Sequence, residues 1–107
     1  MQEKYHKLVR DRIPEIILQD GCTSRIETLD EHEFELALRE KLLEEAHEVA
    51  SAPPYELLNE LADLYEVLDT LLQQHALTPQ MLQARQAERF QARGGFSQRI
   101  RLLEVLR

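Results

Sequence analysis

Two segments organise this sequence: Lys41-Leu-Leu-Glu-Glu-Ala-His-Glu48 and Asn59-Glu-Leu-Ala-Asp63. Their acids are spaced Glu44-Glu45-x-x-Glu48 and Glu60-x-x-Asp63. Residues three or four positions apart lie on one face of a helix, one turn above the other. If both segments are helical and pack antiparallel, their carboxylates can surround a hard divalent cation, which would offset the repulsion between like charges at that spacing.

The residues around these segments predict two helices with a short break between them. Asp30 and Glu33 form a capping-box pattern in front of a helix expected over residues 31–50. Ser51-Ala-Pro-Pro54 ends that helix, because proline cannot continue it. A second helix is expected over residues 55–75, and the short connection predicts that the two helices run antiparallel.

The acids of both segments adjoin the expected core. On a helical wheel, at roughly 100° per residue, Glu45 falls at the edge of the apolar arc beside Leu38. Glu60 falls inside the arc of the second helix, between Val67 and Leu71. A chain with 20 acids contains such pairs by chance, so ordinary solvated acids are one interpretation. The other is a metal site, because an acid among leucines is costly unless it is paired or metal-bound.

The N-terminal part of the chain predicts a short helix and a loop. Pro14 suits the first turn of a helix over residues 15–19, and Gly21 is the expected residue after its end. Residues 22–29 are expected to form a loop, with a short strand over residues 24–29 as the alternative.

The C-terminal part predicts a third long helix and a tail. Thr78-Pro79 is typical of a helix start, and the helix is expected to continue through residue 92. Its apolar residues would face inward. The tail, residues 96–107, is rich in leucine and needs a surface on which to dock. The inward-facing set is Met81, Leu82 and Phe90.

Composition limits the class of protein. The 107 residues are expected to form a single domain spanning 1–107, and the few glycines and prolines favour helices. The net charge of −7 argues against binding a nucleic acid polymer, which needs a basic surface. Cys22 is the single cysteine and cannot form an internal disulfide. No apolar run approaches 18 residues, so we expect no membrane span and a cytoplasmic location.

The type of metal follows from the ligand atoms. Glu44 and His47 have the Glu-x-x-His spacing of di-iron carboxylate bundles, but Glu60-Leu-Ala-Asp63 supplies no second histidine. An all-oxygen ligand set favours Mg²⁺, or Mn²⁺, over zinc and iron.

The acid pattern resembles the signature of the all-α nucleoside triphosphate pyrophosphohydrolase superfamily, the MazG-like and phosphoribosyl-ATP pyrophosphohydrolase-like proteins. Lys7-Leu-Val-Arg-Asp-Arg-Ile-Pro14 is similar to the opening of a small MazG-like subgroup, and Arg93-Gly-Gly-Phe96 to a segment near its end. The resemblance implies Mg²⁺-dependent hydrolysis of a nucleoside triphosphate, or a related nucleotide, to the monophosphate and pyrophosphate.

Site residues are carried over from the resemblance by position. The metal ligands it implies are Glu45, Glu48, Glu60 and Asp63. Glu44, beside them, would support the ligands without binding the metal itself, or would help to orient the attacking water. The candidate catalytic acids are Glu44 and Glu45. Lys41, one turn before Glu45, could contact a phosphate or form a salt bridge with the acids. Arginines that could bind phosphate, or pair with surface acids instead, are Arg10, Arg12, Arg85, Arg89 and Arg93.

The sequence therefore predicts an all-α protein. An antiparallel helical hairpin with additional helices would form a four-helix-bundle-type core, completed by homo-oligomerisation as a dimer or tetramer. The rival to the enzyme is a non-catalytic helical oligomer that binds a nucleotide or a partner protein. The base is open, since the aromatic residues that could stack on it are few: Tyr5, Phe34, Tyr55, Tyr65, Phe90 and Phe96.

Overall fold

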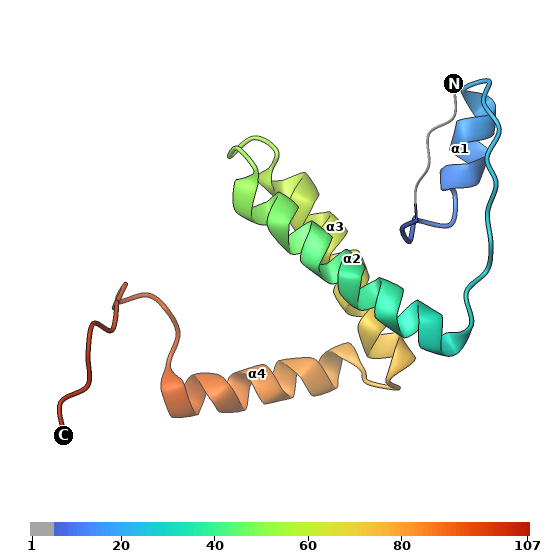
Figure 1. Cartoon of the computed structure of the whole chain (residues 1–107). Coiled ribbons are helices and arrows are strands. Elements are labelled where there is room, and N and C mark those ends of the chain that lie inside the picture. The colour runs from blue at the N-terminus through green and yellow to red at the C-terminus, as the bar shows by residue number, and fades with distance from the viewer. Residues whose placement is uncertain (1–5) are drawn as a thin grey trace.

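The computed structural model describes residues 6–107, which contain four α-helices and no strand. The helices are α1 (Ile13–Gln19), α2 (Glu31–Ser51), α3 (Leu57–Gln74) and α4 (Pro79–Arg93), as Figure 1 shows. The predicted all-α class is confirmed, and the strand considered as an alternative within residues 22–29 does not form. Tyr5 lies outside the described residues.

The ends of α1 follow from two residues. Pro14 lies in its first turn, and the helix starts at Ile13, two residues before the predicted start. Gly21 has a φ of +83° and allows the chain to turn back. Its N–H donates to the Leu18 carbonyl at 3.0 Å, and the Cys22 N–H donates to the Ile17 carbonyl at 3.1 Å. This pair of bonds is a Schellman motif, so the prediction that Gly21 follows the helix end is confirmed.

The predicted capping box begins α2. The Glu33 N–H donates to the Asp30 carboxylate at 2.8 Å, and the Asp30 N–H donates to the Glu33 carboxylate at 3.4 Å. The helix ends at Ser51, one residue beyond the prediction. A proline turn then connects it to α3, with the Glu56 N–H donating to the Pro53 carbonyl at 3.0 Å, so α3 starts two residues later than predicted.

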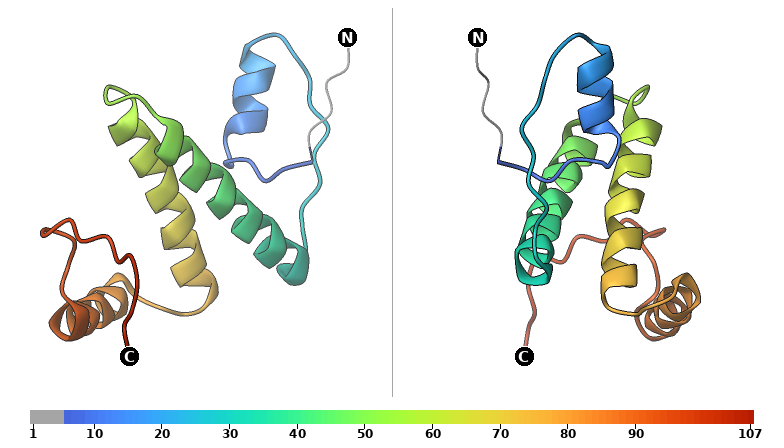
Figure 2. Two further views of the ribbon diagram at one scale, coloured as in Figure 1. Left: turned by 60° about the vertical axis from the view of Figure 1, so that its left-hand side comes forward. Right: turned by 90° about the vertical axis from the view of Figure 1, so that its right-hand side faces the viewer.

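Helices α2 and α3 pack side by side, and the chain reverses direction between them (Figures 1 and 2). Leu38 of α2 and Val67 of α3 are the buried apolar residues of this helix pair. No other pair of helices within residues 6–107 shares a comparable contact. The helix pair therefore determines the relative position of the two acidic segments, one on α2 and the other on α3.

Helix α4 leaves the helix pair instead of packing against it (Figure 1). The expectation that Met81, Leu82 and Phe90 face inward is wrong, because all three are exposed. Among residues 6–107 the tail also finds no docking surface, and Phe96 is 97% exposed. The physical reason is composition: α4 is mostly Gln, Arg, Glu and Ala, and Met81, Leu82 and Phe90 bury too little area to hold it in place.

The result is an extended chain. Its radius of gyration is 18.6 Å, whereas a compact domain of this length has about 13 Å. Its principal extents are 61 × 34 × 26 Å. None of the helices in this part of the chain combines the length and the apolar composition needed to cross a bilayer.

Candidate metal centre

Three carboxylates from the two acidic segments come together between α2 and α3. One oxygen each from Glu45, Glu60 and Asp63 lies within 4.8 Å of the other two. Oxygen ligands of Mg²⁺ lie about 2.1 Å from the ion, so they are at most about 4.2 Å from one another. Small rotations of these side chains would close the three oxygens around one ion. We refer to the three residues as the acid cluster.

Glu45 is the buried member of the acid cluster, with 9% of its surface exposed. Its position beside Leu38 on the helix explains this burial, as the wheel predicted. The Lys41 ammonium, one turn earlier in α2, lies 3.5 Å from Glu45 Oε1. A buried carboxylate without such a partner would be costly. Of the two roles considered for Lys41, the salt bridge is therefore the one formed in this structure.

Glu60 is a member of the acid cluster at a position where a negative charge is disfavoured. Partial burial raises its pKa, and the charges of Glu48, Asp63, Glu45 and Glu56 raise it further. All these effects act in one direction because each disfavours a further negative charge at this point. A divalent cation bound to the same oxygens would reverse the effect, so Glu60 is the residue whose environment best fits a metal ligand.

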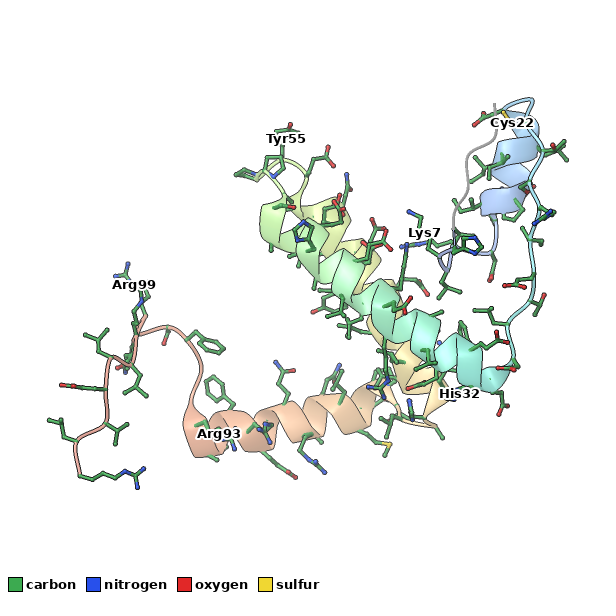
Figure 3. The ribbon with its side chains drawn as sticks, in the orientation of Figure 1. Lys7, Cys22, His32, Tyr55, Arg93 and Arg99 are labelled. Atoms are coloured by element: carbon green, nitrogen blue, oxygen red, sulfur yellow. The ribbon has the colours of Figure 1, made fainter. Side chains whose placement is uncertain are left out.

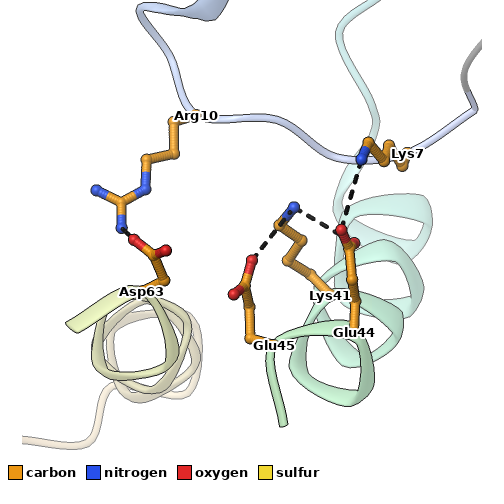
Figure 4. Close-up of polar contacts among 6 residues, drawn as sticks. All are labelled: Lys7, Arg10, Lys41, Glu44, Glu45 and Asp63. Atoms are coloured by element: carbon orange, nitrogen blue, oxygen red, sulfur yellow. Dashed lines mark hydrogen bonds and ion pairs between the residues drawn. The ribbon is translucent and has the colours of Figure 1, made fainter. Parts of the chain in front are cut away.

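A segment before α1 crosses the acidic side of the helix pair. We call residues 7–12 the N-terminal strap. Arg10 Nη2 donates to Asp63 Oδ1 at 2.8 Å, and Lys7 Nζ lies 3.5 Å from Glu44 Oε1 (Figure 4). The strap therefore contacts both helices and brings positive charge to the cluster from outside it.

Glu44 lies beside the acid cluster and binds two cations. Lys41 Nζ lies 3.3 Å from its Oε2, and Lys7 contacts its other oxygen. Partial burial raises the pKa of Glu44, but the hydrogen bonds and charges of Lys41 and Lys7 outweigh this effect and lower the pKa overall. Glu44 is consequently an ionised carboxylate at neutral pH, next to the cluster but not part of it.

Several predicted site residues lie outside the acid cluster. Glu48 is exposed and is not grouped with the other three acids, although its charge acts on Glu60. Arg12 pairs with Glu15 of α1. The basic stripe lies on α4, where Arg85 pairs with Glu88. Because α4 extends away from the helix pair, Arg85, Arg89 and Arg93 do not approach the cluster within one chain (Figures 1 and 3).

Two further placements concern histidine and lysine. His47 is exposed, and the grouped ligands in the described chain include no histidine, so the Glu-x-x-His alternative gains no support. Lys7 was not among the candidate site residues, yet it contacts Glu44. The sequence does contain a signal for this contact, because Lys7 and Arg10 are three residues apart in the segment that resembles the opening of the MazG-like subgroup.

Comparison of the chain with models of protein families, with curated proteins and with solved structures found no match. The candidate site is therefore the acid cluster together with the residues that surround it. That arrangement consists of three oxygen ligands, one adjacent ionised acid and three nearby cations.

Proposed function

We propose that this chain is a Mg²⁺-dependent nucleotide pyrophosphohydrolase, which converts a nucleoside triphosphate or a related nucleotide to the monophosphate and pyrophosphate. The observation that carries the proposal is the convergence of Glu45, Glu60 and Asp63 from two helices within 4.8 Å. The resemblance of the acid spacing and of residues 7–14 to the MazG-like superfamily supports the reaction class. A cytoplasmic location and removal of unwanted nucleotides belong to the same proposal.

The ligand chemistry fits a hard divalent cation. Glu45, Glu60 and Asp63 would hold it, with Glu48 one turn beyond Glu45 as a fourth oxygen donor. When bound, Mg²⁺ neutralises phosphate charge and lowers the pKa of a coordinated water. A ligand set made only of carboxylates favours Mg²⁺ or Mn²⁺ over zinc.

The neighbouring residues supply the remaining chemistry. Glu44 is ionised, so it can accept a proton from the attacking water or orient it. Lys41, Lys7 and Arg10 carry positive charge to the edge of the cluster. If a triphosphate bound at this edge, its phosphate oxygens would replace the carboxylates as the partners of these three cations. Arg10 could then bind two phosphate oxygens at once, as arginine commonly does.

One observation favours the non-catalytic alternative. Arg10 and Lys41 already pair with Asp63 and Glu45, at 2.8 Å and 3.5 Å. Ion pairs of this kind can stabilise an acidic helix pair without any metal, in a helical oligomer that binds a nucleotide or a partner protein.

Pyrophosphate release from a panel of ordinary and modified nucleoside triphosphates, with Mg²⁺ or with EDTA, separates the two. We expect turnover only with Mg²⁺, and a loss of at least about 100-fold in Glu60→Gln and Asp63→Asn. Glu66→Gln is the matched control, because Glu66 is an exposed acid on the same helix outside the cluster. If no nucleotide is hydrolysed and Glu60→Gln binds Mg²⁺ as well as the wild type does, the enzyme proposal is wrong.

A further inference from the structure

The N-terminal strap belongs to a segment that is held loosely on the rest of the chain. Residues 6–29 comprise the strap, α1 and the loop before α2, and none of them is buried. Leu8 is the half-buried apolar residue of the strap. Burial of apolar surface is the main force that fixes one segment on another. Within the described residues, the position of the strap therefore depends mainly on its charged contacts.

Two ion pairs link the strap to the helix pair. Arg10 contacts Asp63 of α3 at 2.8 Å, and Lys7 contacts Glu44 of α2 at 3.5 Å (Figure 4). The four side chains are between 36% and 55% exposed. Ion pairs at such positions shift an equilibrium by about 1.4- to 5-fold each. Together they favour the strap's closed position by about 2- to 30-fold, which a ligand can reverse.

The strap brings the same charge to the acidic side as one divalent ion would. Lys7 and Arg10 supply two positive charges there, whereas Arg12 pairs with Glu15 of α1. A guanidinium held by one carboxylate would be repelled by a doubly charged ion bound beside that carboxylate. Metal binding would thus remove the electrostatic reason for the strap to stay closed.

Asp63 is the side chain on which the two demands meet. It is a member of the acid cluster and also the partner of Arg10. The 2.8 Å contact is a charge-assisted hydrogen bond, which requires a particular orientation of the carboxylate. Mg²⁺ requires an orientation too, because it binds oxygens at about 2.1 Å in near-ideal octahedral geometry. An ion at the acid cluster therefore competes with Arg10 for one carboxylate.

Movement of the strap needs no change in the helix pair. Helix α1 stands apart from α2 and α3 (Figures 1 and 2). Residues 23–29 form no helix, and no backbone hydrogen bond joins them to the helix pair. The strap and α1 can consequently swing on this loop while the capping box at Asp30 keeps the start of α2 in place.

We propose that the N-terminal strap is a latch that a divalent cation releases. Without the ion, Arg10 and Lys7 hold the strap across the acidic side. An ion bound at the acid cluster takes over Asp63, and the strap moves away together with α1. Release makes both cations available to phosphate oxygens, so phosphate binding by these residues follows metal binding. The inference rests on the metal of the proposed function and not on hydrolysis.

The distance between two labels on the full chain tests the release. Cys22 is the single cysteine, is exposed, and lies directly after α1, so it can carry a nitroxide. Ala50→Cys, at an exposed position of α2, carries the second nitroxide for pulsed EPR. We expect a narrow distance distribution in EDTA. In Mg²⁺ we expect a broader one, in which at least about half of the molecules have changed distance.

Variants in the labelled chain test the cause. Lys7→Gln with Arg10→Gln should give the broad distribution in EDTA and bind Mg²⁺ about 2- to 30-fold more tightly, since the coupling is reciprocal. Arg12→Gln is the matched control, because Arg12 is in the strap but pairs with Glu15. Arg10→Asp with Asp63→Arg keeps an ion pair but removes a metal ligand, so its distribution should stay narrow in both conditions.

The wild-type residues of the strap give the decisive measurement, so the proposal can fail without any strap variant. An unchanged distance distribution, while calorimetry shows that Mg²⁺ is bound, overturns the latch. So does a chain that binds no Mg²⁺, or a double glutamine variant whose distribution in EDTA equals that of the wild type. Pyrophosphate release with an unmoved strap would overturn the latch and leave the enzyme proposal intact. Strap release without any nucleotide hydrolysis would support the latch and contradict the enzyme.

Discussion

Arg10 and Asp63 are 53 positions apart in the sequence, yet Arg10 Nη2 donates to Asp63 Oδ1 at 2.8 Å. This contact holds the N-terminal strap against α3 and places a guanidinium on one member of the acid cluster (Figure 4). A cation of the chain therefore occupies a position next to the expected metal. Arg10 and a divalent ion must share Asp63 or compete for it.

Replacing Arg10 tests this competition. We expect Arg10→Gln to bind Mg²⁺ or Mn²⁺ about 2- to 10-fold more tightly, because a positive charge near the ion is removed. Both partners are about half exposed, so the loss of stability should be below about 1 kcal/mol. Isothermal titration calorimetry measures the affinity. Arg12→Gln is the control, because Arg12 pairs with Glu15 of α1 and not with the acid cluster. Weaker metal binding in Arg10→Gln would show that the strap assembles the site instead.

The raised pKa of Glu60 predicts a pH-dependent stability in the absence of metal. Because the folded chain binds this proton more readily than the unfolded chain, the acid favours folding at low pH, and the benefit is lost as the pH rises through the folded pKa, above 4.5. In EDTA at neutral pH, Glu60→Gln should therefore unfold at a higher temperature than the wild type, with the difference vanishing in acid. Adding Mg²⁺ should stabilise the wild type and not the variant.

Thermal unfolding by circular dichroism at several pH values measures both effects. Glu66→Gln removes an exposed acid from the same helix and should reproduce neither. Equal melting temperatures for Glu60→Gln and the wild type across the pH range would count against the electrostatic interpretation of the cluster.

Glu35, near the start of α2, contacts His75 at the end of α3. Its effect on stability has the opposite pH dependence to that of Glu60. His75 Nε2 lies 2.9 Å from Glu35 Oε1, and Arg39 Nε lies 2.8 Å from the same oxygen. The hydrogen bonds with His75 and then Arg39 lower the pKa of Glu35. Its contribution to stability is present above the unfolded pKa and is lost as the pH falls through the lower, folded pKa. Glu35→Gln should thus be less stable than the wild type at neutral pH but equally stable in strong acid, with Glu40→Gln as the control.

The end of α3 contains a residue in an unfavourable backbone conformation. Ala76 has a φ of +52°, and the Ala76 and Leu77 N–H groups donate to the Gln73 and Leu72 carbonyls at 3.2 Å and 2.8 Å. This is a Schellman motif with alanine where glycine is preferred. Ala76→Gly should stabilise the chain by about 0.5–1.5 kcal/mol.

The same substitution inside α3 should have the opposite sign. Ala62 is exposed within the helix, and Ala62→Gly should cost about 1 kcal/mol. Chemical unfolding of both variants gives the comparison. A destabilising Ala76→Gly would mean that the chain does not turn at residue 76 in solution.

Much of the local structure could be predicted from the sequence because it depends on neighbouring residues. The capping box at Asp30, the proline break after Ser51 and the glycine after α1 each act within a few positions. The spacing of Glu45 and of Glu60 with Asp63 put those acids beside the expected core, and their convergence needed only that α2 and α3 pack together.

Contacts between distant segments could not be predicted in this way. The sequence does not state where residues 7–12 cross, so the pairing of Lys7 with Glu44 and of Arg10 with Asp63 depends on the folded chain. The direction of α4 was missed because its few apolar residues satisfy helical periodicity equally well whether they face their own chain or solvent.

By itself, the sequence determined the helices, their caps and the acidic face of each segment, since hydrogen bonds and side-chain spacing within a helix are local. Only the tertiary structure decided which acids meet, which cations contact them and which apolar side chains stay exposed. Those outcomes depend on the balance of buried area between segments far apart in the chain, and one chain of this composition does not have enough apolar surface in α4 to cover its own helix pair.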